Sequence, residues 1–150
     1  MRTFGTPAEL AKAVGEHLGY SGWRLVDQAQ VDAFAEATGD RQWIHTDPER
    51  AAQGPYGTTI AHGYLLLSLL PSLVTSVLTV EGARLRVNYG LNKVRFPAAL
   101  PTGSAVRAGV RVTSAEDVSG GVQLVLEVTV EREGGQKPVC VAETVTRIYL

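Results

Sequence analysis

An apolar window of 15 residues, from Tyr64 to Leu78, is the feature that most constrains the fold of this chain. A helix needs roughly 20 apolar residues to cross a bilayer, so this window is too short to do so. Polar residues and one proline also interrupt it, at Ser68, Pro71, Ser72, Thr75 and Ser76. The window therefore predicts a helix at the centre of a water-soluble protein, around which the rest of the chain must pack.

The chain after this window predicts β-strands. Four segments are rich in Val, Leu, Thr and Arg with much alternation, namely residues 83–96, 104–116, 122–131 and 139–150;. Turn-forming residues separate these segments at 97–103, 119–121 and 133–137, which favours hairpins and an antiparallel sheet;. Helices followed by strands indicate an α+β fold, and the simplest packing wraps the sheet around the helix at 61–78. A sheet of few strands leaves an edge that a homodimer could cover.

The N-terminal segment predicts a first, peripheral helix. Thr6-Pro7-Ala8-Glu9 combines an N-cap, a proline at the first helical position and a capping-box glutamate;. That helix is expected to end near Gly19, before a strand at residues 23–26.

A second helix is predicted between Asp27, as its N-cap, and Gly39, as its stop;. Its apolar face carries Val31, Phe34 and Ala35. Residues 41–59 are rich in Gly, Pro, Asp and Gln and predict a long surface loop with at most one helical turn, at 48–52;. Long ordered loops are often functional.

Size and charge exclude several classes of protein. The 150 residues, 45% of them hydrophobic, suit a single domain over 1–150;. Fourteen basic and fifteen acidic side chains give a net charge of -1, so no broad field favours nucleic acid or an anionic membrane;. The single cysteine, Cys140, allows neither an internal disulfide nor a cysteine cluster for zinc, and it fits a reducing cytoplasm;. Cys140 itself is expected to be a buried strand residue.

Three residues offer parts of a water-adding or water-removing site. A carboxylate at Asp40 and an imidazole at His45 can hold one water between them and move its proton;. The N–H of Gly63, at the expected start of the apolar helix, can stabilise negative charge on a carbonyl oxygen. Spacing alone favours a plainer interpretation, in which Asp40 satisfies turn amides and His45 lies on the surface. Gly63 could likewise serve only close packing.

The motifs around these residues resemble those of MaoC-like dehydratases and R-specific enoyl-CoA hydratases. The resemblance covers nearly the whole chain and rests on Thr38-Gly39-Asp40, Ile44-His45, Gly57-Thr58-Thr59-Ile60-Ala61-His62-Gly63 and the segment 88–97. It is closest to the small stand-alone members, also called NodN-like. The resemblance implies a hot-dog fold, in which a sheet wraps a central helix and pairs as a homodimer.

The resemblance also implies the chemistry. Asp40 and His45 match the family's catalytic acid and histidine, and Gly63 matches the glycine whose N–H faces the thioester oxygen. Asp40 would take a proton from water, while His45 orients that water and assists proton transfer during reversible hydration of a trans-2-enoyl thioester, a reaction of fatty acid metabolism. The chain departs from the family in one place, because Gln42 and Trp43 stand where the motif has Asn and Pro.

The substrate implied is an acyl thioester of coenzyme A or of acyl carrier protein, with no cofactor and no metal. Its expected binding residues are Gln42, Tyr56, Gly57, His62, Tyr64, Asn92, Lys93 and Arg95. Lys93 and Arg95 are candidates for the coenzyme A phosphates, although alternating basic residues on a strand are more often its solvated face. For His62 we favour a structural role, and we judge a zinc site built from Asp40, His45 and His62 to be poorly spaced. Two other functions remain open, namely acyl-CoA thioester hydrolysis and non-catalytic acyl-thioester binding as a partner subunit.

Overall fold

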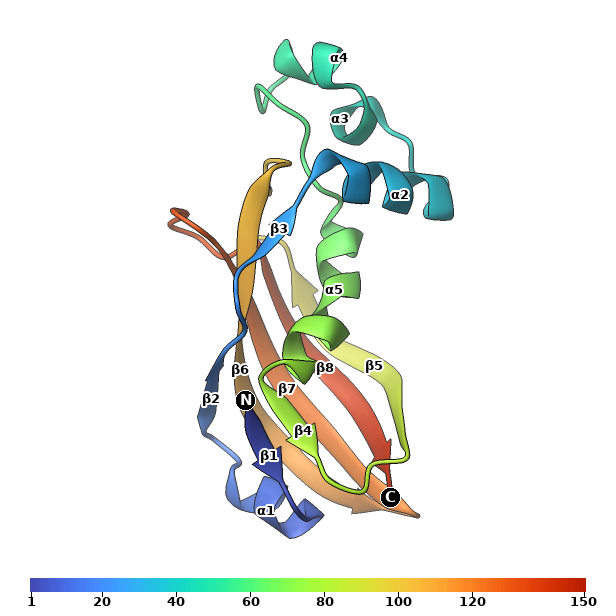
Figure 1. The fold of residues 1–150 in the computed structure, drawn as a ribbon, viewed down its shortest axis with the longest axis vertical. Coiled ribbons are helices and arrows are strands. Elements are labelled where there is room, and N and C mark those ends of the chain that lie inside the picture. Colours follow the sequence, from blue (N-terminus) through green and yellow to red (C-terminus); the bar gives the residue numbers. More distant parts are fainter.

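An antiparallel sheet curves around one apolar helix in the computed structural model, which describes residues 1–150 (Figure 1). The helix is α5, Gly63–Thr75, and it lies within the predicted range. The four predicted strands are present as β5 (Leu85–Arg95), β6 (Ser104–Val118), β7 (Gly121–Arg132) and β8 (Cys140–Tyr149). The expected α+β arrangement of a sheet wrapped around a central helix, as in a hot-dog fold, is confirmed.

The sheet has six strands, in the order β2-β6-β7-β8-β5, where β2 is His17–Tyr20; the sixth strand, β3 (Arg24–Val26), also pairs with β6. Hairpins join β6 to β7 and β7 to β8, as predicted. The hairpin expected at 97–103 is wrong, because β5 pairs with β8 at the opposite side of the sheet from β2 and β3. The 97–103 segment instead runs past the start of α5, where Ala61 N–H donates to Leu100 O at 2.8 Å.

Alternation along the strands builds the core. The side chains that face α5 from β6 are Val106, Ala108, Val110 and Val112, all fully buried. Those from β7 are Val122, Leu124, Leu126, Val128 and Val130. The helix contributes Leu65, Leu66, Leu69, Leu70 and Leu73. Full burial of one such side chain stabilises the fold by about 1.5–3 kcal/mol relative to exposure, so the sheet fixes the position of α5.

The N-terminal elements differ from the sequence prediction in part. The helix start is confirmed in α1 (Pro7–Lys12), where the Thr6 side chain accepts a hydrogen bond from Glu9 N–H. The predicted end near Gly19 is wrong, because Gly15 turns the chain with φ 88° and β2 (His17–Tyr20) then pairs with β6. Two short strands were not predicted, β1 (Arg2–Phe4) and β4 (Leu78–Val80), which pair in parallel.

Three helices gather at the N-terminal end of α5 (Figure 1). After the short strand β3 (Arg24–Val26), α2 (Gln28–Thr38) begins at its Asp27 cap and ends at Gly39, as predicted. The segment 41–59 holds the predicted turn as α4 (Pro48–Ala52). It also holds α3 (Trp43–Thr46), which was not predicted and which buries His45, so this segment is more than a surface loop.

The longest helix, α5, has 13 residues, and no helix of this chain has the length and apolarity needed to cross a membrane.

Candidate active site

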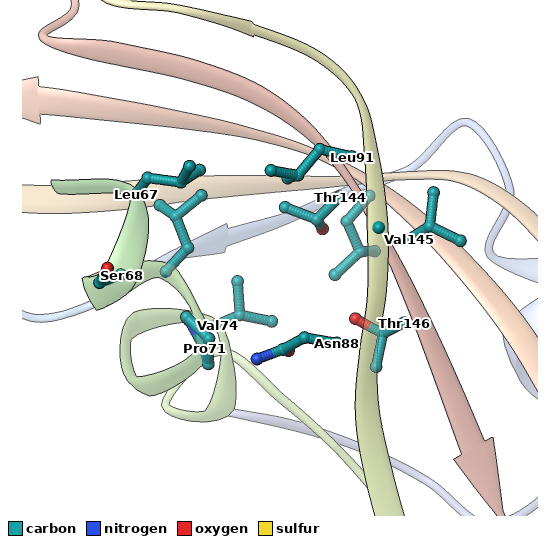
Figure 2. A pocket seen from close by; sticks show the side chains of 12 residues that line it. Leu67, Ser68, Pro71, Val74, Asn88, Leu91, Thr144, Val145 and Thr146 are labelled. Carbon is teal, nitrogen blue, oxygen red and sulfur yellow. The ribbon is translucent and has the colours of Figure 1, made fainter. Parts of the chain in front are cut away.

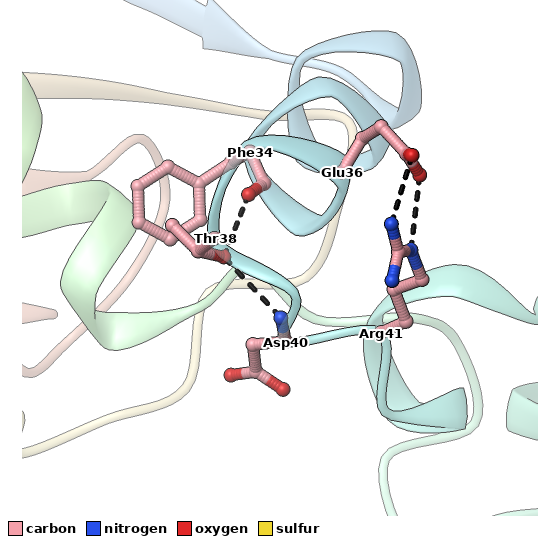
Figure 3. A network of polar contacts seen from close by, with 5 residues as sticks. All are labelled: Phe34, Glu36, Thr38, Asp40 and Arg41. Atoms are coloured by element: carbon pink, nitrogen blue, oxygen red, sulfur yellow. Dashed lines mark hydrogen bonds and ion pairs between the residues drawn. The ribbon is translucent and has the colours of Figure 1, made fainter.

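Asp40 is placed by the end of α2. Gly39 adopts a left-handed conformation, with φ 80°, which ends the helix and turns the chain;. The Thr38 hydroxyl accepts a long hydrogen bond of 3.4 Å from Asp40 N–H (Figure 3). The Asp40 side chain is exposed and points away from the ion pair that Glu36 and Arg41 form across this turn. Its carboxylate therefore stays free to accept a proton.

The Glu36–Arg41 pair itself contributes little to stability. Its N–O distance is 2.8 Å, and both side chains are more than half exposed, so water screens the interaction;. The hydrogen bond from Arg41 lowers the pKa of Glu36.

His45 is held with one ring nitrogen committed and the other available. Its side chain is buried, and Nδ1 lies 2.7 Å from the main-chain oxygen of Ile60. Because a carbonyl oxygen only accepts hydrogen bonds, Nδ1 carries the proton and neutral Nε2 keeps a lone pair. Burial lowers the pKa of His45 below its ordinary value of 6.5; the Ile60 hydrogen bond opposes this shift, nearby His62 adds to it, and Asp40 opposes it. His45 is therefore a neutral hydrogen-bond acceptor near pH 7.

The main chain of His45 is positioned by Gln28, which the sequence analysis missed. The Gln28 side-chain amide donates to His45 O at 2.7 Å, and its oxygen accepts from the Thr59 hydroxyl at 2.6 Å. Gln28 thereby ties the first turn of α2 to α3 and to the strand-like segment before α5. No local signal in the sequence distinguishes this glutamine from other helix-surface residues.

His62 contacts both Asp40 and His45. It is 3% exposed, and its Nε2 lies 2.9 Å from the main-chain oxygen of Asp40. Its ring stacks on that of His45, with centroids 3.8 Å apart and planes at 23°. Phe34 also packs against His62 in an edge-to-face arrangement, with the ring centroids 5.0 Å apart. This burial agrees with the structural role favoured for His62 from the sequence, and its role in binding substrate stays a prediction.

The site brings the acid and the imidazole within reach of one water. A carboxylate oxygen of Asp40 and ring nitrogens of His45 and His62 all lie within 4.8 Å of one another. Two hydrogen bonds of about 2.8 Å can span that distance, so a single water can contact Asp40 and His45 together. The same three residues make a poor metal site, because His45 Nδ1 and His62 Nε2 already lie 2.7 and 2.9 Å from main-chain oxygens, which leaves one free nitrogen on each ring;.

Gly63 supplies a free amide beside this pair. It is the first residue of α5, follows His62 directly, and its N–H donates to no acceptor in the protein. The helix dipole adds partial positive charge there. A side chain at this position would displace Phe96, because a Cβ atom would lie 2.9 Å from Cδ2 of that ring. Close packing and an accessible N–H therefore both apply to this glycine.

The backbone at Gln42 and Trp43, where the chain departs from the family motif, has a conformation that also suits a proline at position 43. Gln42 has φ -56° and ψ 140°, the conformation that a residue before proline adopts, so proline would fit at position 43;. Trp43 instead packs its ring on Gly54, where a Cβ would approach to 2.9 Å, and under the guanidinium of Arg50 at 4.5 Å. These contacts hold α3 against α4. The Gln42 side chain is exposed and provides no cap to α3.

The other predicted binding residues differ in their exposure and in their contacts. Tyr56, Gly57 and Tyr64 are exposed. The rings of Tyr64 and Phe96 pack edge to face, with their centroids 6.1 Å apart. Asn92 is engaged by Glu143 at 2.6 Å. Lys93 and Arg95 line a shallow pocket that also contains Glu127 and Glu143, so acidic groups offset their charge.

A larger pocket lies between α5 and strands β5 and β8 (Figure 2). Its volume is about 440 Å³. None of the predicted site residues lines it; the sequence analysis missed its lining, which includes Leu67, Ser68, Pro71, Asn88, Leu91 and Thr146. The interruptions of the apolar window at Ser68 and Pro71 were the available signal, because both residues line this pocket.

Comparisons with known proteins agree on one family. The family described as MaoC like domain matches residues 9–134. The chain is 56% identical over 148 residues to 3-hydroxyacyl-thioester dehydratase Z of Mycobacterium tuberculosis (strain ATCC 25618 / H37Rv), covering 98% of each chain. It is 44% identical to Nodulation protein N of Rhizobium leguminosarum bv. viciae, covering 94% of this chain and 89% of that protein. A solved (R)-hydratase from A. caviae involved in PHA biosynthesis matches with a TM-score of 0.69 and 27% identity, covering 89% of this chain and 94% of that chain.

Proposed function

The chain belongs to the MaoC-like dehydratase family, and we propose that it is an R-specific hydro-lyase that reversibly adds water to trans-2-enoyl thioesters, giving (R)-3-hydroxyacyl thioesters. One observation carries this proposal: the Asp40 carboxylate and the neutral His45 ring lie within 4.8 Å, at the start of a helix with a free N–H. The names of two relatives support it, a 3-hydroxyacyl-thioester dehydratase and an (R)-hydratase.

The proposed reaction uses both hydrogens of one water. Asp40 accepts one proton as the water oxygen bonds to C3 of the enoyl group, and Asp40 then returns a proton to C2. His45 Nε2 has no hydrogen to donate, so it orients the water by accepting from the other O–H, which becomes the product hydroxyl. Dehydration is the same sequence in reverse.

Charge moves onto the thioester oxygen as the C2–C3 double bond is attacked. The Gly63 N–H is proposed to stabilise that oxygen, with help from the α5 dipole;. Removal of one such donor typically raises the barrier by roughly 3–4 kcal/mol. No metal or cofactor is needed for these steps.

The substrate is proposed to lie along α5. Its thioester would sit at Gly63, and its acyl chain would extend toward the pocket that begins one turn further along, at Leu67. Half of the twelve lining residues are hydrophobic, which suits an acyl group;. Lys93 and Arg95 are the basic candidates for the coenzyme A phosphates. A free, buried thiol at Cys140 fits the proposed cytoplasmic location;.

We also propose a homodimer formed through β5. This strand lies at the end of the sheet, so one of its edges is unpaired along 11 residues. It exposes Leu85, Tyr89 and Leu91, the last to 46%. A second copy of β5 would satisfy the free edge and cover these side chains. In light scattering, Leu91→Glu is expected to give a monomer, whereas Leu25→Glu, on the opposite edge at β3, keeps the dimer.

The decisive experiment follows the conjugated enoyl absorbance of crotonyl-CoA and of a longer enoyl-CoA. Wild type is expected to consume substrate without release of free thiol, and Asp40→Asn and His45→Gln are each expected to fall at least about a hundredfold. Asp47→Asn is the matched control. Asp47 caps α4 by accepting from Arg50 N–H at 3.0 Å, a role that asparagine also fills;.

Two results would contradict the proposal. Release of free thiol would identify a thioesterase, in which water attacks the carbonyl carbon instead of C3. Inactivity of the folded wild type on both substrates would indicate an acyl-thioester-binding subunit without catalysis.

A further inference from the structure

We infer that His62 is a positioning residue, which fixes the main chain of Asp40 through its Nε2–H and the ring plane of His45 through stacking. This role deepens the proposed hydration reaction and rests on it. It differs from substrate contact, because the His62 side chain is 3% exposed.

The first contact restrains the acid. The Asp40 main chain is held by only two hydrogen bonds, namely its N–H to Thr38 Oγ1 at 3.4 Å and its carbonyl to His62 Nε2 at 2.9 Å. The bond to Thr38 is long, and the Asp40 carboxylate itself is exposed;. The His62 bond is thus the stronger restraint on where this carboxylate stands.

The second contact restrains the imidazole that orients the water. The bond from Nδ1 to Ile60 O and the stacked His62 ring at 3.8 Å together limit how the His45 ring can turn, and so where Nε2 points. Phe34 packs against His62 in turn. Because Gly63 is the next residue, one side chain links all three proposed reacting groups.

A role in packing alone does not explain this ring. The Asp40 carbonyl requires the tautomer with hydrogen on Nε2, which leaves Nδ1 buried and without a hydrogen-bond partner. Burial of an unpaired polar atom is unfavourable, and a phenyl ring would stack without it. The imidazole therefore provides something a phenyl ring cannot, which is the donor to Asp40.

Substitutions can separate the two contacts. In His62→Gln, the amide nitrogen lies three bonds from Cβ, as Nε2 does in histidine, so the donor remains while the ring is lost. In His62→Phe, the ring remains while the donor is lost. His17→Phe is the matched control, because His17 is an exposed histidine that also packs beside an aromatic ring, that of Tyr20, with the ring centroids 5.0 Å apart and the planes tilted by 49°.

The test measures kcat and KM for crotonyl-CoA together with hydrogen exchange of the amides at 39–42. His62→Phe is expected to lower kcat about tenfold, the equivalent of one lost hydrogen bond, with KM within about twofold. Exchange at 39–42 is expected to rise about tenfold in the same variant. His62→Gln keeps the donor but lacks the ring, so exchange at 39–42 is expected to stay within about threefold of wild type, while kcat is expected to fall about threefold through loss of the stacking on His45.

Equal kcat and equal exchange in His62→Phe and His62→Gln would overturn the inference. If His62→Phe does not fold, His62→Asn replaces it, because its amide lies only two bonds from Cβ and cannot reach Asp40 O; it must then fall about tenfold below His62→Gln. Inactivity of wild type would refute the proposed function, and the exchange measurement alone would then decide the role of His62.

Discussion

The substitution Gly63→Ala tests whether this glycine serves packing, catalysis or both. The added methyl would lie 2.9, 3.0 and 3.1 Å from three ring carbons of Phe96. Ordinary contacts between carbon atoms are about 3.5–4.0 Å, so each of these is too short by about 0.4–1.1 Å. Gly63 is not among the residues with positive φ, so the backbone itself accepts alanine.

The stability cost of Gly63→Ala depends on how far the Phe96 ring can move. Overpacking of this kind costs about 1–3 kcal/mol, and Phe96 is 38% exposed, so its ring can swing outward and the lower half of that range is expected;. In a Phe96→Ala background the clash disappears, and the same substitution should cost close to zero. Urea unfolding of the four proteins gives this coupling energy as a double-mutant cycle.

Activity should behave differently from stability. In the double variant the methyl still stands beside the Gly63 N–H, where the thioester oxygen must approach, so hydration of crotonyl-CoA is expected to stay at least about tenfold below that of Phe96→Ala. Full recovery of activity in the double variant would show that Gly63 serves only packing. An unchanged free energy of unfolding in Gly63→Ala would refute the packing argument.

Three further predictions concern the tryptophan, the buried histidine and the cysteine. Trp43→Ala should destabilise the fold by about 1–3 kcal/mol and lower kcat, because α3 loses its contacts with Gly54 and Arg50;. Trp23→Ala should leave kcat unchanged. Urea unfolding and steady-state kinetics check both variants. Because the pKa of His45 is below 6.5 in the folded protein, the unfolded chain binds more protons just below pH 6.5. The free energy of unfolding should therefore decrease as the pH is lowered below 6.5, and it should decrease less in His45→Gln. Hydration should persist below pH 6.5 until His45 is protonated. Burial raises the pKa of Cys140 to about 11, so a thiol reagent at pH 8 should modify it only after unfolding; prompt reaction of the native protein would contradict its burial;.

The strands and the central helix could be predicted because their signals are local. Alternation over β6 and β7, the caps at Thr6, Asp27 and Gly39, and the apolar run of α5 depend on residues close in sequence. Prediction was less accurate where pairing with a distant strand decides the local structure. The first helix was extended to Gly19, because the pairing of β2 with a strand some ninety residues away is invisible locally.

The candidate site was only partly predictable for the same reason. Asp40, His45 and Gly63 were found by motif, and the structure places the first two within 4.8 Å with Gly63 beside His62. The pocket between α5 and β5 was missed, because it arises where Asn88 and Thr146 from different strands face one helix. The role of Lys93 and Arg95 in binding stays a prediction.

The central helix, the four long strands and the residues able to carry acid–base chemistry could be read from the sequence alone, since composition and spacing act over a few residues. The three-dimensional fold was needed to show that β5 pairs with β8, that His45 is buried with Nδ1 on Ile60 O, and that His62 contacts both Asp40 and His45. These features depend on contacts between residues far apart in the chain. Hydrogen-bond direction, burial and ring stacking depend on three-dimensional proximity, which no local pattern encodes.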